Sequence, residues 1–127
     1  MIYLLDTSVV IDHMRGRSFI DSNCIEKAVG ISIITIGELL YGVYKSDDTK
    51  KALDAVNSFL TDLDIDIVPL NELIMSKFAA IKVYLEKKGK RLEDFDLLIA
   101  VTALVNNLTL VTYNKRHFER IEGLIIY

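Results

Sequence analysis

The chain of 127 residues has one cysteine, one proline, two histidines and no tryptophan. A single cysteine excludes an intramolecular disulfide framework and a cysteine-rich zinc site, and it agrees with a reducing compartment. The two histidines, His13 and His117, lack zinc-ligand spacing to each other and to Cys24. The sequence also has no Gly-rich phosphate loop and no G-x-S-x-G motif. Zinc, nucleotide-loop and serine-nucleophile chemistry therefore have little support.

Long apolar runs and an excess of basic residues are missing as well. The longest nearly unbroken apolar stretch, residues 97–105, has about half of the ~18 residues that a membrane span needs. The N-terminal apolar run is too short for a signal peptide and ends at Asp6. Fifteen basic and 18 acidic residues give a net charge of −3, which argues weakly against a nucleic-acid binder. We expect one domain over residues 1–127, located in the cytoplasm.

The chain does contain short apolar runs that alternate with helical patterns. Strands are expected before Asp6 and at residues 30–34, 65–68, 109–112 and 124–126. Helices are expected at residues 8–15, 35–44, 47–63 with Asp47 or Asp48 as N-cap, 72–88 with Asn71 as N-cap, and 94–105, with shorter turns at 25–29 and 115–118. This order predicts an α/β fold with a central, mostly parallel sheet of four or five strands and helices on both faces.

Three carboxylates are predicted to meet at the carboxyl edge of this sheet, where ligands bind in such folds. Asp6 follows the first strand, Glu38 lies in the first turn of the helix after the second strand, and Asp96 lies in the first turn of the 94–105 helix. Thr112 and Asn114 follow the fourth strand. Carboxylates around one pocket repel each other unless a cation lies between them, and Mg²⁺ and Mn²⁺ prefer oxygen ligands. The pattern therefore predicts a metal site.

Each of these residues also has a purely structural explanation. Asp6 suits a turn or a cap, Thr35-x-x-Glu38 matches a capping box, and Asp94 is better explained as an N-cap than as a ligand. Asp96 is the hardest to explain in this way, because it opens the most apolar helix of the chain, where an unpartnered carboxylate is costly. The common position of three acids favours the functional explanation.

Four stretches carry a resemblance that covers the whole chain. They are LLDTSVVID (residues 4–12), SIITIGELLYG (32–42), FDLLIA (95–100) and LVTYN (110–114), and FERIEGL (118–124) adds a fifth likeness. In this order they resemble the PIN-domain family, and specifically the VapC-type toxin ribonucleases of prokaryotic toxin–antitoxin pairs. Each motif is weak alone, whereas four in the right order are specific.

The resemblance implies an endoribonuclease that depends on Mg²⁺ or Mn²⁺, with one or two ions, and that leaves a 5′-phosphate and a 3′-hydroxyl. It also implies a homodimer inhibited by a cognate antitoxin. Asp6, Glu38 and Asp96 fall on the family's acidic ligand positions, and Thr112 would orient water or a ligand carboxylate. The family's fourth acid is replaced here by Asn114, which offers a carbonyl oxygen but no charge. Asp94 is a further candidate ligand.

Two basic clusters could contact an RNA backbone. Lys115, Arg116 and Arg120 lie next to the predicted site and are the better candidates. The other cluster, Lys82, Lys87, Lys88, Lys90 and Arg91, is better explained by complementing the end of a helix.

The residues also bear on functions other than the nuclease. Asn114 favours a catalytically weak PIN-like module that binds RNA or a protein. A phospho-acceptor domain would need an aspartate after the third strand, where the chain has Pro69-Leu70-Asn71. A phosphatase with an aspartate nucleophile would need Asp-x-Asp in place of Asp6-Thr7-Ser8. Both fit poorly.

Overall fold

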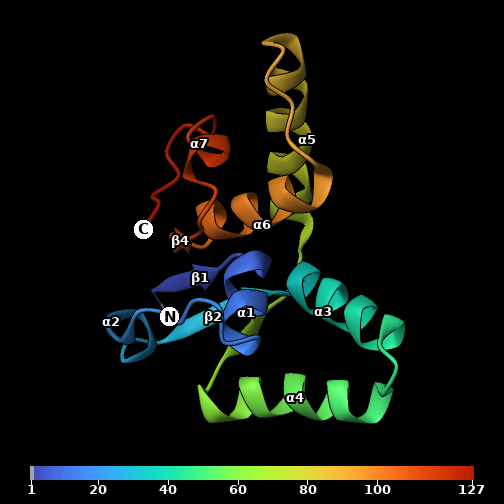
Figure 1. The fold of residues 1–127 in the computed structure, drawn as a ribbon. Helices are drawn as coiled ribbons and strands as arrows, with labels where there is room; N and C mark the ends of the chain where they lie inside the picture. Colours follow the sequence, from blue (N-terminus) through green and yellow to red (C-terminus); the bar gives the residue numbers. More distant parts are fainter. Residues whose placement is uncertain (1) are drawn as a thin grey trace.

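A computed structural model describes residues 2–127, and Met1, which opens the predicted first strand, lies outside the described residues. The strands are β1 (Tyr3–Leu5), β2 (Val29–Ser32), β3 (Asp66–Val68) and β4 (Thr109–Val111). The helices are α1 (Thr7–Met14), α2 (Ser22–Ile25), α3 (Ile33–Lys45), α4 (Thr49–Asp62), α5 (Glu72–Lys87), α6 (Asp94–Val105) and α7 (Lys115–Phe118) (Figure 1).

The four strands form a parallel sheet in the order β3-β2-β1-β4. Tyr3 is in register with Val29 on one side and with Thr109 on the other, so β1 is a central strand. The predicted parallel sheet is confirmed. The predicted fifth strand at 124–126 is reduced to one parallel bridge between Leu110 and Ile126.

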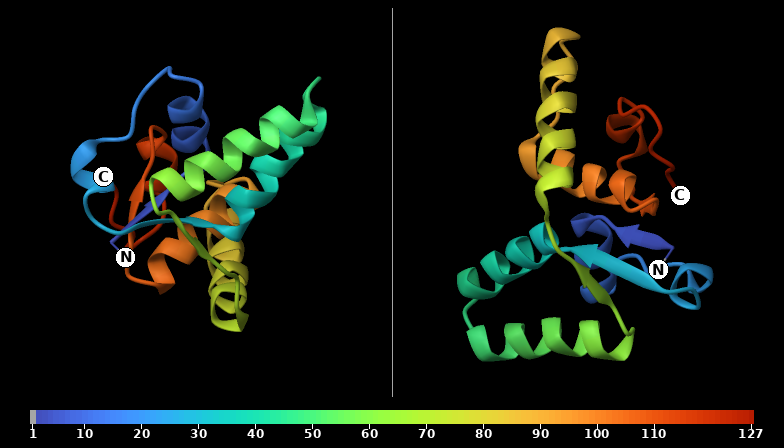
Figure 2. Two further views of the ribbon diagram at one scale, coloured as in Figure 1. Left: turned by 90° about the horizontal axis from the view of Figure 1, so that it is seen from below. Right: turned by 180° about the vertical axis from the view of Figure 1, so that it is seen from behind.

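Helices cover both faces of the sheet, as expected for parallel strands (Figures 1 and 2). Successive residues of β1 point to opposite faces, so Leu4 and Leu5 belong to different cores. Leu5 packs with α1, α3 and α4, where Val9, Leu39 and Phe59 are buried. Leu4 packs with α5, α6 and α7, and the buried residues of these helices include Ile74, Ile99 and Phe118. The carboxyl end of β1 therefore emerges between two helical layers.

Helix α6 is the most buried helix, in agreement with its apolar sequence. Every side chain from Leu97 to Ala103 is buried, because α6 packs against both the sheet and α5. Its N-terminal turn is the exception, since Asp94 and Asp96 are only half-buried. The turn lies at the carboxyl edge of the sheet, where the negative charge of Asp6 raises the pKa of Asp96. Within residues 2–127, none of the helices combines the length and apolar character that crossing a bilayer requires.

The predicted caps of the two long surface helices are confirmed. Asp48 Oδ1 accepts a hydrogen bond of 3.0 Å from Lys51 N at the start of α4. Asn71 Oδ1 accepts one of 2.9 Å from Ile74 N at the start of α5. Gly89, at φ +67°, ends α5 in the left-handed conformation that glycine adopts without a steric penalty.

Helix α3 begins two residues earlier than predicted. The β-branched residues Ile33 and Ile34 favour a strand, but Ser32 Oγ accepts a 3.0 Å hydrogen bond from Ile34 N and starts the helix there. Glu38 consequently lies in the second turn of α3, and the prediction of the first turn is wrong. The capping-box explanation for Thr35-x-x-Glu38 is also wrong, because Thr35 lies inside the helix.

Candidate active site

Asp6 lies at the carboxyl end of β1 and is only 5% exposed. It is the N-cap of α1, where its Oδ1 accepts a 2.8 Å hydrogen bond from Thr7 N. Its other oxygen, Oδ2, accepts hydrogen bonds from Thr112 Oγ1 at 2.9 Å and from Ser8 Oγ at 3.4 Å. Burial raises the pKa of Asp6, and these hydrogen bonds oppose the rise. Asp6 therefore caps α1, as its structural explanation predicted. It also makes a long-range contact with Thr112.

Thr112 provides that long-range contact from the end of β4. Its side chain is buried, and Oγ1 both donates to Asp6 and accepts a 3.0 Å hydrogen bond from Asn114 N. A hydroxyl can donate once and accept twice, so both roles are compatible. Thr112 thus joins the strand ends of β1 and β4 and fixes the orientation of the Asp6 carboxylate.

Glu38 reaches the same region from α3. Its Oε1 accepts a 2.8 Å hydrogen bond from Thr7 Oγ1, and Thr7 Oγ1 also lies 2.9 Å from the hydroxyl of Thr35. Thr7 and Thr35 are buried, whereas Glu38 is half-buried. Thr7 and Thr35 are site residues that the sequence pattern did not predict. The adjacency of Thr7 to Asp6 was the available signal, because the first residue of α1 must lie beside its cap.

Asp96 completes the set of acids from the first turn of α6. Burial raises its pKa first, and the negative charges of Asp6, Glu38 and Glu93 raise it further, while His117 lowers it. Asp6 and Glu38 therefore lie near enough to Asp96, at the carboxyl edge of the sheet, for their charges to act on it.

Asp94 is the first residue of α6, and Glu93 occupies the N-cap position without a side-chain capping bond. The expectation that Asp94 is the N-cap is therefore wrong by one residue. Asp94 lines a hollow together with Glu38 and Asp96, but its Oδ1 lies 2.9 Å from Lys82 Nζ on α5. This ion pair gives its charge a protein partner.

Asn114 and His117 form the outer rim of the site. Asn114 Nδ2 lies 2.7 Å from His117 Nδ1, and both side chains are exposed. Together with Asp96 and Arg120 they line a hollow of about 390 Å³. His117, which lacks zinc-ligand spacing in the sequence, therefore lies beside the acids.

The basic residues near the acids are not only those that the sequence predicted. Arg91, assigned to the end of a helix, lines both hollows that contain Asp96. Arg120 Nη1 donates to the backbone carbonyls of Arg91 at 3.0 Å and Lys90 at 3.4 Å, so part of its function is structural. Lys115 and Arg116 are exposed at the start of α7. Spacing did not reveal Arg91, because the turn after α5 brings it back to the acids.

The donor chemistry of this site suits a hard divalent cation, since carboxylate, amide and hydroxyl oxygens face one region. The negative charges of Asp6 and Glu38 raise the pKa of Asp96, and a shared cation would relieve this repulsion. Within residues 2–127, however, no three His, Cys, Asp or Glu side chains lie close enough together to enclose an ion. The residues fit the group by chemistry and charge, and ligation requires the carboxylates to draw together.

Known proteins with similar sequences share this architecture. The family model of the PIN domain matches residues 3–124. The chain belongs to the PIN-domain family. The curated relatives of this PIN-domain chain include Ribonuclease VapC1 of Methanocaldococcus jannaschii, 38% identical over 98% of this chain and 85% of that protein.

Solved structures agree over the full length. The VapBC2 complex of Rickettsia felis, bound to a DNA fragment from its promoter, contains a chain with TM-score 0.90 and 31% identity, covering 100% of this chain and 98% of that one. VapBC-1 of nontypeable Haemophilus influenzae matches with TM-score 0.90 and 29% identity, covering 100% and 97%. The predicted resemblance to VapC-type PIN proteins is confirmed.

Proposed function

We propose that this PIN-domain protein is a metal-dependent endoribonuclease and the toxin of a toxin–antitoxin pair, folded as one domain over residues 1–127. The observation that carries the proposal is the position of the acids: Asp6 is buried after β1, Glu38 and Asp96 line one hollow, and the charges of Asp6 and Glu38 reach Asp96. The names of the relatives support the substrate class, since the curated relative is a ribonuclease and the solved relatives are VapBC complexes.

Asp6, Glu38 and Asp96 would hold Mg²⁺ or Mn²⁺, and the Asn114 carbonyl oxygen is a weaker, uncharged ligand. When bound, such an ion lowers the pKa of a water molecule and neutralises charge on the phosphodiester during hydrolysis. Thr112 keeps the Asp6 carboxylate in position, and Thr7 does the same for Glu38. Asp94 is a low-ranking ligand candidate, because Lys82 already neutralises it.

The RNA backbone would be held by cations near the acids. Lys115, Arg116 and Arg120 remain the proposed contacts, and the position of Arg91 beside Asp96 adds it to this group. Phosphate contacts of this kind position the chain without reading its sequence.

The direct test is cleavage of a structured RNA with Mn²⁺ by the wild type, Asp6→Asn and Asp96→Asn. Each variant removes one charged ligand and preserves side-chain volume, so cleavage should fall by roughly a thousandfold, since metal assistance supplies several kcal/mol. Asp66→Asn is the matched control, because Asp66 is exposed at the start of β3, on the opposite edge of the sheet. Undiminished cleavage in both site variants would refute the proposal.

This protein has a groove, partly lined by Glu38, in which the proposed antitoxin could bind. A cavity of about 310 Å³ between α1, α3 and α4 is lined by Ile11, Leu39, Val43 and Val56, and Glu38 also lines it. An antitoxin segment with apolar side chains and one cationic residue would fill this groove and neutralise Glu38. A homodimer is also proposed, on the resemblance alone.

Asn114 favours one alternative, a catalytically weak module that binds RNA or a protein. Its amide nitrogen contacts His117, and its oxygen adds no charge to the site. Calorimetric titration with Mn²⁺ separates the two functions, since no binding at millimolar metal would favour the module.

A further inference from the structure

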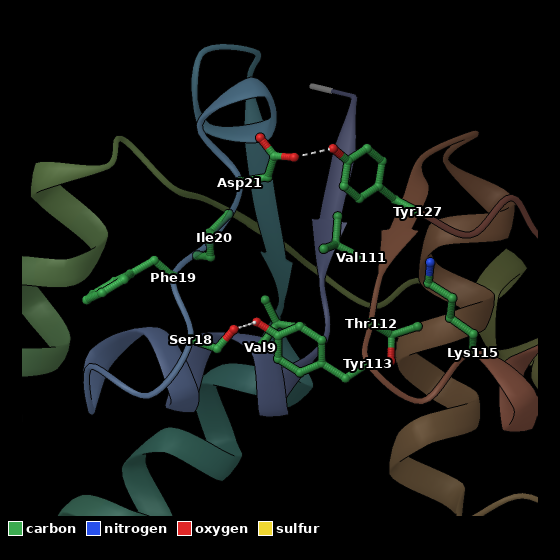
Figure 3. Close-up of a pocket in the computed structure, with 10 residues that line it drawn as sticks. All are labelled: Val9, Ser18, Phe19, Ile20, Asp21, Val111, Thr112, Tyr113, Lys115 and Tyr127. Carbon is green, nitrogen blue, oxygen red and sulfur yellow. Dashed lines mark hydrogen bonds between the residues drawn. The ribbon is translucent and has the colours of Figure 1, made fainter.

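A second pocket adjoins the acids and has a different chemistry. It has a volume of about 410 Å³ and lies between the end of β4, helix α1 and the segment from Ser18 to Asp21 (Figure 3). Thr112 lines this pocket and donates its hydroxyl hydrogen to Asp6. A group bound here would therefore lie one side chain away from the proposed phosphodiester site.

One end of the pocket presents a fixed aromatic ring. Tyr113 is 52% exposed, yet its hydroxyl donates a 2.9 Å hydrogen bond to Ser18 Oγ, across 95 positions of sequence. Figure 3 shows this pair at the lower end of the pocket, with Val9 beside it. An exposed ring that is held in place offers a stacking surface at a low entropic cost.

The other end presents hydrogen-bond acceptors. Tyr127 donates its hydroxyl hydrogen to Asp21 Oδ2, while Asp21 Oδ1 accepts a 2.9 Å hydrogen bond from Asn23 N. These bonds lower the pKa of the Asp21 carboxyl, so it remains an anion near neutral pH. Each carboxylate oxygen can accept a second hydrogen bond. This end suits an amino group and repels a phosphate.

Lys115 also lines the pocket, near Thr112 (Figure 3). A ligand would thus meet the ring of Tyr113, the carboxylate oxygens of Asp21 and the cation of Lys115, which lies on the side of Thr112 and the acids. A nucleotide satisfies all three, since its base stacks and donates while its phosphate pairs with a lysine.

We propose that this pocket is a base-binding subsite for the nucleotide next to the scissile phosphate, selective for bases with an exocyclic amino group. The base stacks on Tyr113, its amino group donates to Asp21, and its phosphate lies toward Lys115. The proposal rests on RNA as the substrate in the proposed function. It adds which bases are favoured and which residues read them.

Nucleotide binding can be measured without cleavage, by NMR titration of ¹⁵N-labelled protein with AMP, CMP, GMP and UMP in metal-free buffer. The amide signals of Ser18, Asp21 and Tyr113 should shift with at least one amino-bearing nucleotide, with UMP binding several-fold more weakly. Tyr113→Ala should weaken binding about tenfold, the size of one lost stacking contact. Tyr113→Phe keeps the ring and should retain most of the affinity.

Two controls make the result specific. Tyr44→Ala removes another exposed tyrosine, on α3, and should leave binding unchanged. Asp21→Asn keeps a side-chain acceptor for Asn23 N but removes the charge, and should reduce the preference over UMP. Equal binding of all four nucleotides, no shift at the three amides, or an unaltered Tyr113→Ala variant would overturn the subsite.

The outcomes are distinguishable from those of the cleavage test. If Asp6→Asn and Asp96→Asn abolish cleavage but no nucleotide shifts these amides, the subsite is refuted and the nuclease stands. If nucleotides bind as expected and the wild type cleaves no RNA, the pocket stands and the nuclease is refuted.

Discussion

The acidic site has two halves that are built in different ways. In the inner half, hydroxyl groups orient the carboxylates: Thr112 donates to Asp6, and Thr7 donates to Glu38. In the outer half, Asp96 is surrounded mainly by charges, and exposed Asn114 and His117 contact each other. The inner carboxylates are therefore positioned by the fold itself, whereas the outer half depends on what neutralises it.

The pKa shifts express the same difference. Burial raises the pKa of Asp6, and three hydrogen-bond donors counteract it. Burial also raises the pKa of Asp96, but there the neighbouring carboxylates add to the rise. A preorganised carboxylate beside a responsive one suits the proposed site, which would bind a cation together with its substrate.

Thr112→Val should have the largest effect on folding stability and tests the inner half. Valine keeps the shape of threonine and removes the donor to Asp6, so folding stability should fall by about 2 kcal/mol, as for other hydrogen bonds to charged groups. Cleavage should slow by about tenfold to a hundredfold, the usual cost of losing a partner that orients a metal ligand. Because this hydrogen bond lowers the pKa of Asp6, its loss raises that pKa, and the acidic limb of the pH–rate profile should move to higher pH.

Thr112→Ser is the matched control for the valine variant. Serine restores the hydroxyl, so both the rate and the acidic limb should return close to the wild type. If the valine variant shifts neither the rate nor the limb, the inner half does not orient a ligand.

Asp96→Asn should have a smaller effect, on stability, and tests the outer half. The pKa of Asp96 is raised in the folded state, so its charge destabilises the fold at neutral pH, and stability returns as the pH falls through that pKa. At pH 7 without divalent cations, the variant should therefore melt a few degrees higher than the wild type, and this gain should vanish toward acid pH. Adding Mg²⁺ should raise the melting temperature of the wild type more than that of the variant. Thermal unfolding followed by circular dichroism measures both, and a variant that melts lower at pH 7 would contradict the charge argument.

Much of the fold could be predicted from the sequence, because strand and helix patterns alternate regularly. The parallel sheet, the buried α6 and the caps at Asp48 and Asn71 all follow from local patterns. The start of α3 did not follow, since the β-branched pair after Ser32 resembles a strand and the serine cap decides against it.

The site could be predicted only in part. Topology indicates that acids after parallel strands share an edge, and this brings Asp6 near Glu38 and Asp96. Topology does not indicate which hydroxyl reaches which carboxylate, so the bond from Thr7 to Glu38 was not foreseen. The bond between Tyr113 and Ser18 was equally hidden, since it joins two loops whose course depends on packing.

Asn114→Asp should have the smallest effect and would make the outer half resemble a fully acidic site. A carboxylate near Asp96 should tighten Mn²⁺ binding about fivefold, since one additional unit charge is worth about 1 kcal/mol at 4 Å in solvent. The same charge should destabilise the metal-free protein and raise the pKa of Asp96 further, because both groups repel. Calorimetric titration gives the affinity, and Asn114→Ala, which removes the oxygen ligand, should change it in the opposite direction. Equal Mn²⁺ affinity in the wild type, Asn114→Asp and Asn114→Ala would mean that position 114 lies outside the cation site. The inner and outer halves would then differ in which residues bind the cation as well as in their hydrogen bonds.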